Sequence, residues 1–190
     1  MSKKYKIPTR NGLVGEWKLD GSALDTSGNN NTGTFTNGSY ATTDRGYQSQ
    51  CGVFNGSTAR MDATVPTQSA NVNFSVSFWI KRTGTGSASN NSVVQMQNGS
   101  SARFGAWINA SNQMGIWNSS GTFAYSTVVP ALNVWEHWVV IRDGTNGYLY
   151  QNGQLVYTLA TSSNDGAQVI NAIKIGCREN NAEFFNGQVQ

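Results

Sequence analysis

Apolar and polar residues alternate along many short segments of this chain. In residues 74–80, FSVSFWI, phenylalanine, valine and isoleucine take the even positions, whereas two serines and Trp79 take the odd ones. A period of two is typical of a β-strand with one buried face. Residues 103–108 and 172–176 are further short runs of this kind. No stretch of ten or more residues has an apolar period near 3.6, so the pattern predicts strands rather than helices.

Turn dipeptides separate these segments. Asn-Gly occurs seven times and Asp-Gly three times, and both supply the positive φ angles that tight hairpins need. In residues 134–156, VWEHWVVIRDGTNGYLYQNGQLV, turns at Asp143-Gly144 and Asn152-Gly153 predict three successive antiparallel strands, a β-meander. Such closely spaced turns without intervening helices are typical of an all-β sandwich or barrel.

Length and composition fit one such domain. A single β-sandwich of 190 residues can bury a substantial core, and six tryptophans, seven tyrosines and eight phenylalanines are available to fill it. Only 12% of residues are charged and the net charge is +3, which is not the composition of a disordered chain. The sequence has no stripe of basic residues interleaved with aromatics and no run of 18 apolar residues. We therefore expect neither a nucleic-acid partner nor a membrane span.

Residues 1–11 form a basic arm. No apolar stretch follows it, as one would in a secretory signal peptide. Two interpretations remain: a solvated tail, or an arm that docks on an acidic neighbouring subunit. The docking residues would be Lys3, Lys4, Lys6 and Arg10.

Cys51 and Cys177 are the only cysteines. Neither belongs to a Cys-x-x-Cys pair, and His137 is the single histidine, so the sequence contains no zinc motif. The two cysteines could form one disulfide between distant strands or remain two buried thiols. We favour the thiols, because no signal peptide indicates export.

The carboxylates form no recognisable catalytic pair. A β-sandwich glycosidase commonly places two carboxylates on one face of a strand, and Glu16 and Asp20 have a compatible i, i+4 spacing. Asp20, however, leads directly into an Asp-Gly turn. Glu136 and His137 are neighbours, so on a strand they point to opposite faces. We therefore expect no enzymatic activity.

The loop at residues 19–31 is rich in oxygen donors. Calcium binds six to eight oxygens, which carboxylates, amides and the backbone carbonyls of a Gly-rich loop can supply. The candidate ligands are Asp20, Asp25, Asn29 and Asn31. The alternative is that Asp and Asn act here as turn residues that hydrogen-bond their own backbone. One structural calcium ion is the single cofactor that the sequence suggests.

Aromatic residues gather around the turn at 110–112. Flat apolar rings beside amide and arginine side chains are what a sugar-binding surface requires. The candidate ligand-binding residues are Arg103, Trp107, Trp117 and Tyr125. The alternative is that these rings pack in the core of the sandwich.

Several short motifs occur in a recognisable order. They are GLVGEWKLD at 12–20, DTSGN at 25–29, GVFNG at 52–56, FSVSFWIK at 74–81, WEHWV at 135–139, LYQNGQLV at 149–156, IG at 175–176 and FNGQ at 185–188. Over residues 12–190 the chain thereby resembles the laminin-G-like jelly-roll domains of the concanavalin A-like lectin/glucanase superfamily. The resemblance implies two curved antiparallel sheets whose concave face often binds glycans or proteins.

The resemblance has three further implications. It places a calcium ion near the end of the first strand, with Asp20 and Asp25 around it. The family's closing strand is missing after Gln190, so we expect the neighbouring strand to be an open edge or to be covered by another chain. The Glu-x-Asp-x-x-Glu strand of the laminarinase-type members is absent, which agrees with the lack of a catalytic pair.

These features favour a non-enzymatic binding module at a surface. We expect a virion surface protein, such as a head-decoration or tail component, that assembles as an oligomer with other virion proteins and also adheres to glycans. The alternative is a carbohydrate-binding lectin module from a secreted or cell-surface protein, and a degenerate glycoside hydrolase is a third hypothesis. The expected location is the virion surface or the extracellular space.

Overall fold

The computed structural model describes residues 12–46, 48–68, 73–86, 90–118, 123–144, 146–160 and 168–190. The predicted docking residues Lys3, Lys4, Lys6 and Arg10 lie outside these ranges. Within the ranges every regular element is a β-strand, and no helix suited to cross a membrane is present. The predicted all-β class is confirmed.

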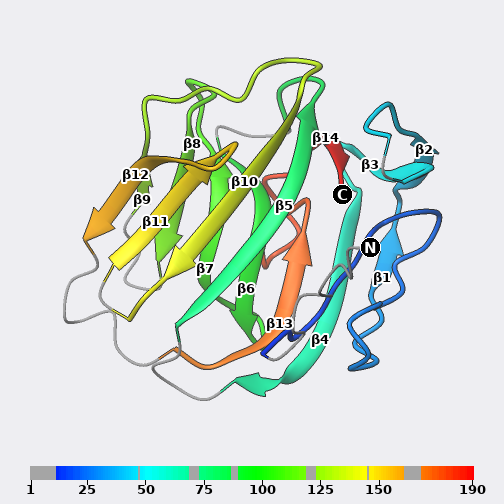
Figure 1. Ribbon diagram of the computed structural model, residues 1–190, viewed down its shortest axis with the longest axis horizontal. Coiled ribbons are helices and arrows are strands. Elements are labelled where there is room, and N and C mark those ends of the chain that lie inside the picture. The colour runs from blue at the N-terminus through cyan, green and yellow to red at the C-terminus, as the bar shows by residue number, and fades with distance from the viewer. Residues whose placement is uncertain are drawn as a thin grey trace, which may run out of the picture.

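The strands form two antiparallel sheets of seven strands each, stacked face to face (Figure 1). The first, the β1–β9 sheet, contains β1 (Thr34–Thr36), β4 (Arg60–Gln68), β13 (Ile170–Ile175), β6 (Asn91–Asn98), β7 (Ser101–Ile108), β8 (Met114–Asn118) and β9 (Phe123–Tyr125), in that spatial order. The second, the β12–β2 sheet, contains β12 (Gln154–Ala160), β11 (Asn146–Gln151), β10 (Trp135–Arg142), β5 (Phe74–Arg82), β14 (Asn186–Val189), β3 (Gln50–Asn55) and β2 (Ser39–Thr42).

The core lies between the two sheets, where alternate side chains of each strand are buried. In β5 and β10 these are the even-numbered residues, such as Ile80 and Trp138, both 0% exposed. Met61 of β4 and Phe104 of β7 pack into the same core from the other sheet. The odd-numbered residues of β5 and β10 therefore face outward. This is the parity that the sequence of residues 74–80 predicts.

The predicted meander is formed by β10, β11 and β12. β11 pairs with β10 on one side and with β12 on the other. The turn between β11 and β12 has φ angles of 49° at Asn152 and 83° at Gly153. Positive φ at both central residues is the requirement of a type I′ turn, which explains why Asn-Gly occurs there.

β14 lies between β3 and β5 but accompanies only part of β5. It pairs with residues 80–82, and Gln190 exchanges two backbone hydrogen bonds of 2.8 and 3.0 Å with Trp79. Within the described ranges, residues 74–78 of β5 have no paired strand on this side. The segment that begins at Gly12 passes between β5 and β4 (Figure 1), and both flank one cavity.

Cys51 and Cys177 are free and buried, which confirms the expectation of two buried thiols. Burial raises the pKa of both, to about 11 for Cys177. A protonated, buried thiol packs as a small apolar group.

Candidate functional site

Trp107 of β7 and Trp117 of β8 lie on the face of the β1–β9 sheet that points away from the core, in a small cluster of their own. Their ring centroids are 6.1 Å apart and their planes meet at 33°. The residues are only 1% and 8% exposed. The two indoles are therefore almost closed to solvent, and a ligand-binding role for them stays a prediction.

Two glycines make room for aromatic rings on this face of the sheet. A Cβ at Gly105 would lie 3.0 Å from Nε1 of Trp107, and a Cβ at Gly115 would clash with the ring of Tyr125. Above the sheet, the guanidinium of Arg178 lies 5.6 Å from the Trp107 ring centroid. Neighbouring protein groups thus cover the rings, which is why they are closed to solvent.

The other two predicted ligand-binding residues lie nearby along the same strands. Tyr125 of β9 packs against the indole pair, and its hydroxyl donates a 2.9 Å hydrogen bond to Oδ1 of Asn90. Burial, and secondly the charge of Glu183, raise the pKa of Tyr125 to about 12, so the hydroxyl stays protonated. Arg103 is half-buried in β7. A ligand-binding role for these residues stays a prediction.

Asp25 organises the loop that was a candidate calcium site. Its carboxylate accepts hydrogen bonds of 2.8 to 2.9 Å from the backbone N–H groups of Glu16, Ser27 and Asn31 and from the Ser27 hydroxyl. Burial, the largest single influence, raises the pKa of Asp25, but these four hydrogen bonds together outweigh it and lower the pKa to about 2. The carboxylate therefore serves as a turn acceptor.

The remaining predicted calcium ligands have other partners. Asp20 accepts hydrogen bonds of 2.9 and 2.7 Å at the start of β3, whereas Asn29 and Asn31 both donate to the carbonyl of Val14. Within the described ranges, no three His, Cys, Asp or Glu side chains are grouped so that they could hold a metal ion. Because both oxygens of Asp25 face N–H and O–H donors, the loop in this arrangement does not fit a calcium site.

Glu136 and His137 point to opposite faces of β10, as their adjacency predicts. Glu136 is 6% exposed and accepts a hydrogen bond from Nε1 of Trp138 on the core side. On the outer face, Nε2 of His137 lies 2.7 Å from Oγ of Ser77. A Ser–His pair activates its hydroxyl when a third group orients the imidazole. No carboxylate in the described part of the chain hydrogen-bonds His137.

Two half-buried tryptophans, Trp79 and Trp135, lie instead on the outer face of the β12–β2 sheet. Trp79 of β5 is paired with His137 of β10, and their ring centroids are 5.0 Å apart. Trp135, at the start of β10, is paired with Lys81 of β5. Burial, and secondly the charge of Arg45, lower the pKa of His137, which keeps the imidazole neutral at neutral pH.

Asp44 and Arg45, in the loop after β2, fix these rings. Asp44 accepts a 2.6 Å hydrogen bond from Nε1 of Trp135 and a 3.1 Å hydrogen bond from Lys81, which bridges to it as an ion pair. The bonds from Lys81 and Trp135 lower the pKa of Asp44 and keep it ionised. The Arg45 guanidinium lies 3.7 Å from the ring centroid of Trp79 and 5.8 Å from that of Trp135. We call Asp44, Arg45, Trp79, Lys81, Trp135 and His137 the Trp135 cluster.

Apolar side chains continue this face along β10 and β11. Val139 is paired with Tyr150 and Ile141 with Tyr148, and all four are half-buried. Because cross-strand partners share one face of a sheet, these four side chains extend the surface that begins at the Trp135 cluster.

A polar depression of about 390 Å³ is present on the β1–β9 sheet. Its lining includes Thr64, Gln97 and Asp62, which forms ion pairs of 2.7 Å with Lys174 and 3.1 Å with Arg60. The depression offers hydrogen-bonding groups, but no aromatic ring lines it.

The Trp135 cluster is absent from the residues predicted to bind a ligand, although strand parity contains a signal for it. Trp79 shares the parity of the serines in residues 74–80, which marks it as outward-facing. Trp135 and His137 likewise share one parity on β10. The sequence does not predict that Trp79, Trp135 and Arg45 lie close together, because they come from three separate segments.

The sequence profile of a laminin-G-like family, described as the concanavalin A-like lectin/glucanases superfamily, matches residues 55–190. No curated protein sequence is significantly similar to the chain. Among solved structures, domain 4 of AbnA, a GH43 extracellular arabinanase from Geobacillus stearothermophilus in complex with arabinotriose, has a TM-score of 0.64 at 18% identity. The superposition covers 93% of this chain and 88% of that one.

Botulinum neurotoxin D supplies further similar structures. Its receptor-binding domain has a TM-score of 0.68 at 17% identity, with 93% of this chain and 48% of that one covered. The serotype D ligand-binding domain in complex with N-acetylneuraminic acid has a TM-score of 0.68 at 18% identity, with coverage of 93% and 46%. The chain thus spans about half the length of these toxin domains. At such identities the similarity shows the fold, a jelly-roll sandwich, as predicted.

The Asp25→Asn variant should be less stable than the wild type at neutral pH by about 1 to 3 kcal/mol, because hydrogen bonds to a charged acceptor become bonds to a neutral one. The pKa of Asp25 is lowered from 3.8 to about 2 on folding. The wild-type stabilisation is therefore complete above about pH 4 and is lost as the pH falls toward about 2. Denaturant unfolding between about pH 6 and 2 measures this, and identical pH dependence of the two proteins would contradict it.

Calcium should leave the melting temperature unchanged. A metal that binds only the folded state raises the melting temperature, and in this arrangement both carboxylate oxygens of Asp25 already accept hydrogen bonds. Thermal unfolding with about 5 mM calcium and with excess EDTA provides the comparison, with Asp25→Asn as the matched variant. A calcium-dependent rise in the wild type that is lost in the variant would restore the calcium site at this loop.

Proposed function

The chain belongs to the concanavalin A-like lectin/glucanases superfamily, and we propose that it binds glycans through the Trp135 cluster, without catalysing a reaction on them. The observation that carries this proposal is the fixed indole of Trp135, held by Asp44 on the outer face of the β12–β2 sheet. An aromatic ring presented beside charged hydrogen-bonding groups is a suitable surface for a pyranose or furanose ring.

The chemistry of the cluster supports a sugar as the ligand. C–H groups of a sugar ring pack on an aromatic face, while its hydroxyls need planar acceptors and donors at the rim. Here Asp44 supplies acceptor oxygens, and Arg45 and Lys81 supply donors beside Trp79 and Trp135. The mutual hydrogen bonds of the cluster fix its geometry before a ligand arrives, which lowers the entropic cost of binding.

The similar solved structures give independent support at the level of the fold. The AbnA domain was solved with arabinotriose and the neurotoxin domain with N-acetylneuraminic acid. Both structures hold a saccharide and contain a region with the fold of this chain, so a glycan-binding role is compatible with this architecture. The choice of the Trp135 cluster as the site is drawn from this chain's own residues.

A glycan array with the purified protein tests the proposal. The wild type should bind at least one class of oligosaccharide on the array. The Trp135→Ala substitution should lower the affinity for that oligosaccharide at least tenfold, equivalent to about 1.4 kcal/mol. Val134→Ala is the matched control, because Val134 is the adjacent apolar residue and is 51% exposed. An unchanged affinity of the Trp135→Ala variant would show that the cluster is not the site. The polar depression around Asp62 would then be the next candidate. If the wild type bound no glycan on the array, the proposal of glycan binding would be rejected.

We further propose that the glycan-binding module acts at the outer surface of a larger assembly, such as a virus particle or a cell. The support is the basic composition of residues 1–11, with Lys3, Lys4, Lys6 and Arg10, which suits attachment to an acidic protein surface. Deletion of residues 1–11 should then reduce the mass of the assembly in light scattering and leave glycan affinity unchanged. An unchanged mass after deletion would reject the arm as the attachment element.

A further inference from the structure

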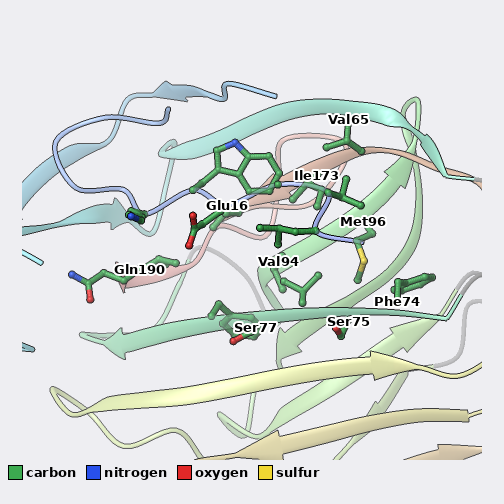
Figure 2. Close-up of a pocket in the computed structure, with 18 of the residues that line it drawn as sticks. Glu16, Val65, Phe74, Ser75, Ser77, Val94, Met96, Ile173 and Gln190 are labelled. Carbon is green, nitrogen blue, oxygen red and sulfur yellow. The ribbon is translucent and has the colours of Figure 1, made fainter. Parts of the chain in front are cut away.

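Lys174 of β13 is a buried lysine on the outer face of the β1–β9 sheet. The preceding residue, Ile173, lines the cavity that β4 and β5 flank (Figure 2). Because neighbours on a strand point to opposite faces, Lys174 points away from that cavity. The residue is only 8% exposed. A lysine is rarely buried to this extent unless its ammonium group is paired, so the groups around its Nζ atom indicate what it can do.

Two side chains of different chemistry meet at the Nζ atom of Lys174. Asp62 of β4, its direct cross-strand partner, forms an ion pair with it at 2.7 Å. Asn181, in the turn that follows β13, accepts a 2.7 Å hydrogen bond from the same nitrogen at its Oδ1 atom. An amine, a carboxylate and a carboxamide are thus in mutual contact, and the carboxamide carbon lies one bond beyond the Oδ1 atom that Nζ touches.

The backbone fixes both sides of this contact. In the turn, the N–H of Arg178 donates a 2.8 Å hydrogen bond to the carbonyl of Ala182, and the N–H of Asn181 donates one of 2.9 Å to the carbonyl of Arg178. Asn181 has a φ of 56°, a left-handed conformation that asparagine tolerates well. On the strand, the register of β13 against β4 sets Lys174 opposite Asp62. Groups held in this way have a high effective concentration toward each other.

The charges around Nζ allow Lys174 to lose its charge without leaving an unpaired carboxylate. Asp62 forms a second ion pair, of 3.1 Å, with Arg60. One carboxylate therefore balances two cations at a place where the side chain of Lys174 is only 10% exposed. Conversion of the ammonium group to a neutral amide would leave Asp62 and Arg60 as a matched pair. It would also remove a charge from surroundings that solvate it poorly.

We propose that Lys174 and Asn181 form an intramolecular amide bond between their side chains, an isopeptide bond, with Asp62 as the general acid–base group. Asp62 takes a proton from the ammonium group, and the neutral Nζ attacks Cγ of Asn181. The bond from Cγ to Nδ2 then breaks as the bond from Nζ to Cγ is completed. The two protons that Nζ loses pass through Asp62 to Nδ2, which leaves as an ammonium ion. The step consumes no oxidant, cofactor or other reactant.

The position of the turn suits both the reaction and its result. Asn181 lies in an exposed part of the turn, so the ammonium ion leaves directly to solvent. The new bond closes a loop over residues 174–181, and a cross-link of this kind lowers the conformational entropy of the unfolded chain. The same turn carries Arg178, whose guanidinium lies over Trp107. The isopeptide bond would therefore stabilise the segment that covers the buried tryptophan pair.

Mass spectrometry of the purified full chain is the direct test. The loss of one ammonia should make the wild type lighter than its sequence by about 17 Da. Trypsin should then cleave after Arg178 but not after Lys174, and the two peptides on either side of Arg178 should stay joined. The joined peptides distinguish this bond from a succinimide at an Asn-Gly pair, which also loses ammonia. Efficient cleavage after Lys174, with no joined peptides after prolonged incubation at about pH 8, would overturn the proposal.

Three variants test the assigned roles. Lys174→Arg keeps the charge but replaces the amine, and Asn181→Gly removes the carboxamide at a φ that glycine adopts freely, so neither should yield joined peptides. Asp62→Asn removes the proton carrier and should slow formation of the bond by at least about tenfold in freshly purified, folded protein.

Asn180→Asp is the matched control, because Asn180 is the adjacent exposed asparagine of the same turn and should not affect the bond. Joined peptides in Lys174→Arg or Asn181→Gly would contradict the assignment of the two residues. A folded Asp62→Asn protein that reacts at the wild-type rate would reject the role of Asp62. These measurements are independent of glycan binding.

Discussion

The alternation of side chains on β5 and β10 is the constraint on which the other features depend. Ile80 and Trp138 must face the core, because their burial stabilises the sandwich, and a shift of one residue would expose them. Once that register is set, Trp79, Trp135 and His137 must face outward, because they alternate with the buried residues along each strand. The surface that we assign to ligand binding is therefore a geometric consequence of how the core is filled.

The two outer faces of the sandwich use their tryptophans differently. On the β1–β9 sheet, Gly105 and Gly115 let aromatic rings lie flat over the strands, and Arg178 covers Trp107 from above. Aromatic packing stabilises that face. On the β12–β2 sheet, by contrast, Asp44 holds the edge of the Trp135 ring and Arg45 lies over the Trp79 ring, and both indoles stay half-buried. Similar residues therefore stabilise one face, and on the other face they form the surface that we propose for ligand binding.

The sequence predicts the elements better than it predicts the site. The meander and the parity of residues 74–80 follow from local pattern and turn chemistry, so they could be recognised without tertiary information. The burial of Trp107 depends on Arg178, far along the chain, and the hydrogen bonds of Asp25 include the N–H of Glu16, nine residues before it. Local spacing contains neither contact. The short Asx turn from Asp25 to Ser27 is the one part of that network that the sequence could indicate.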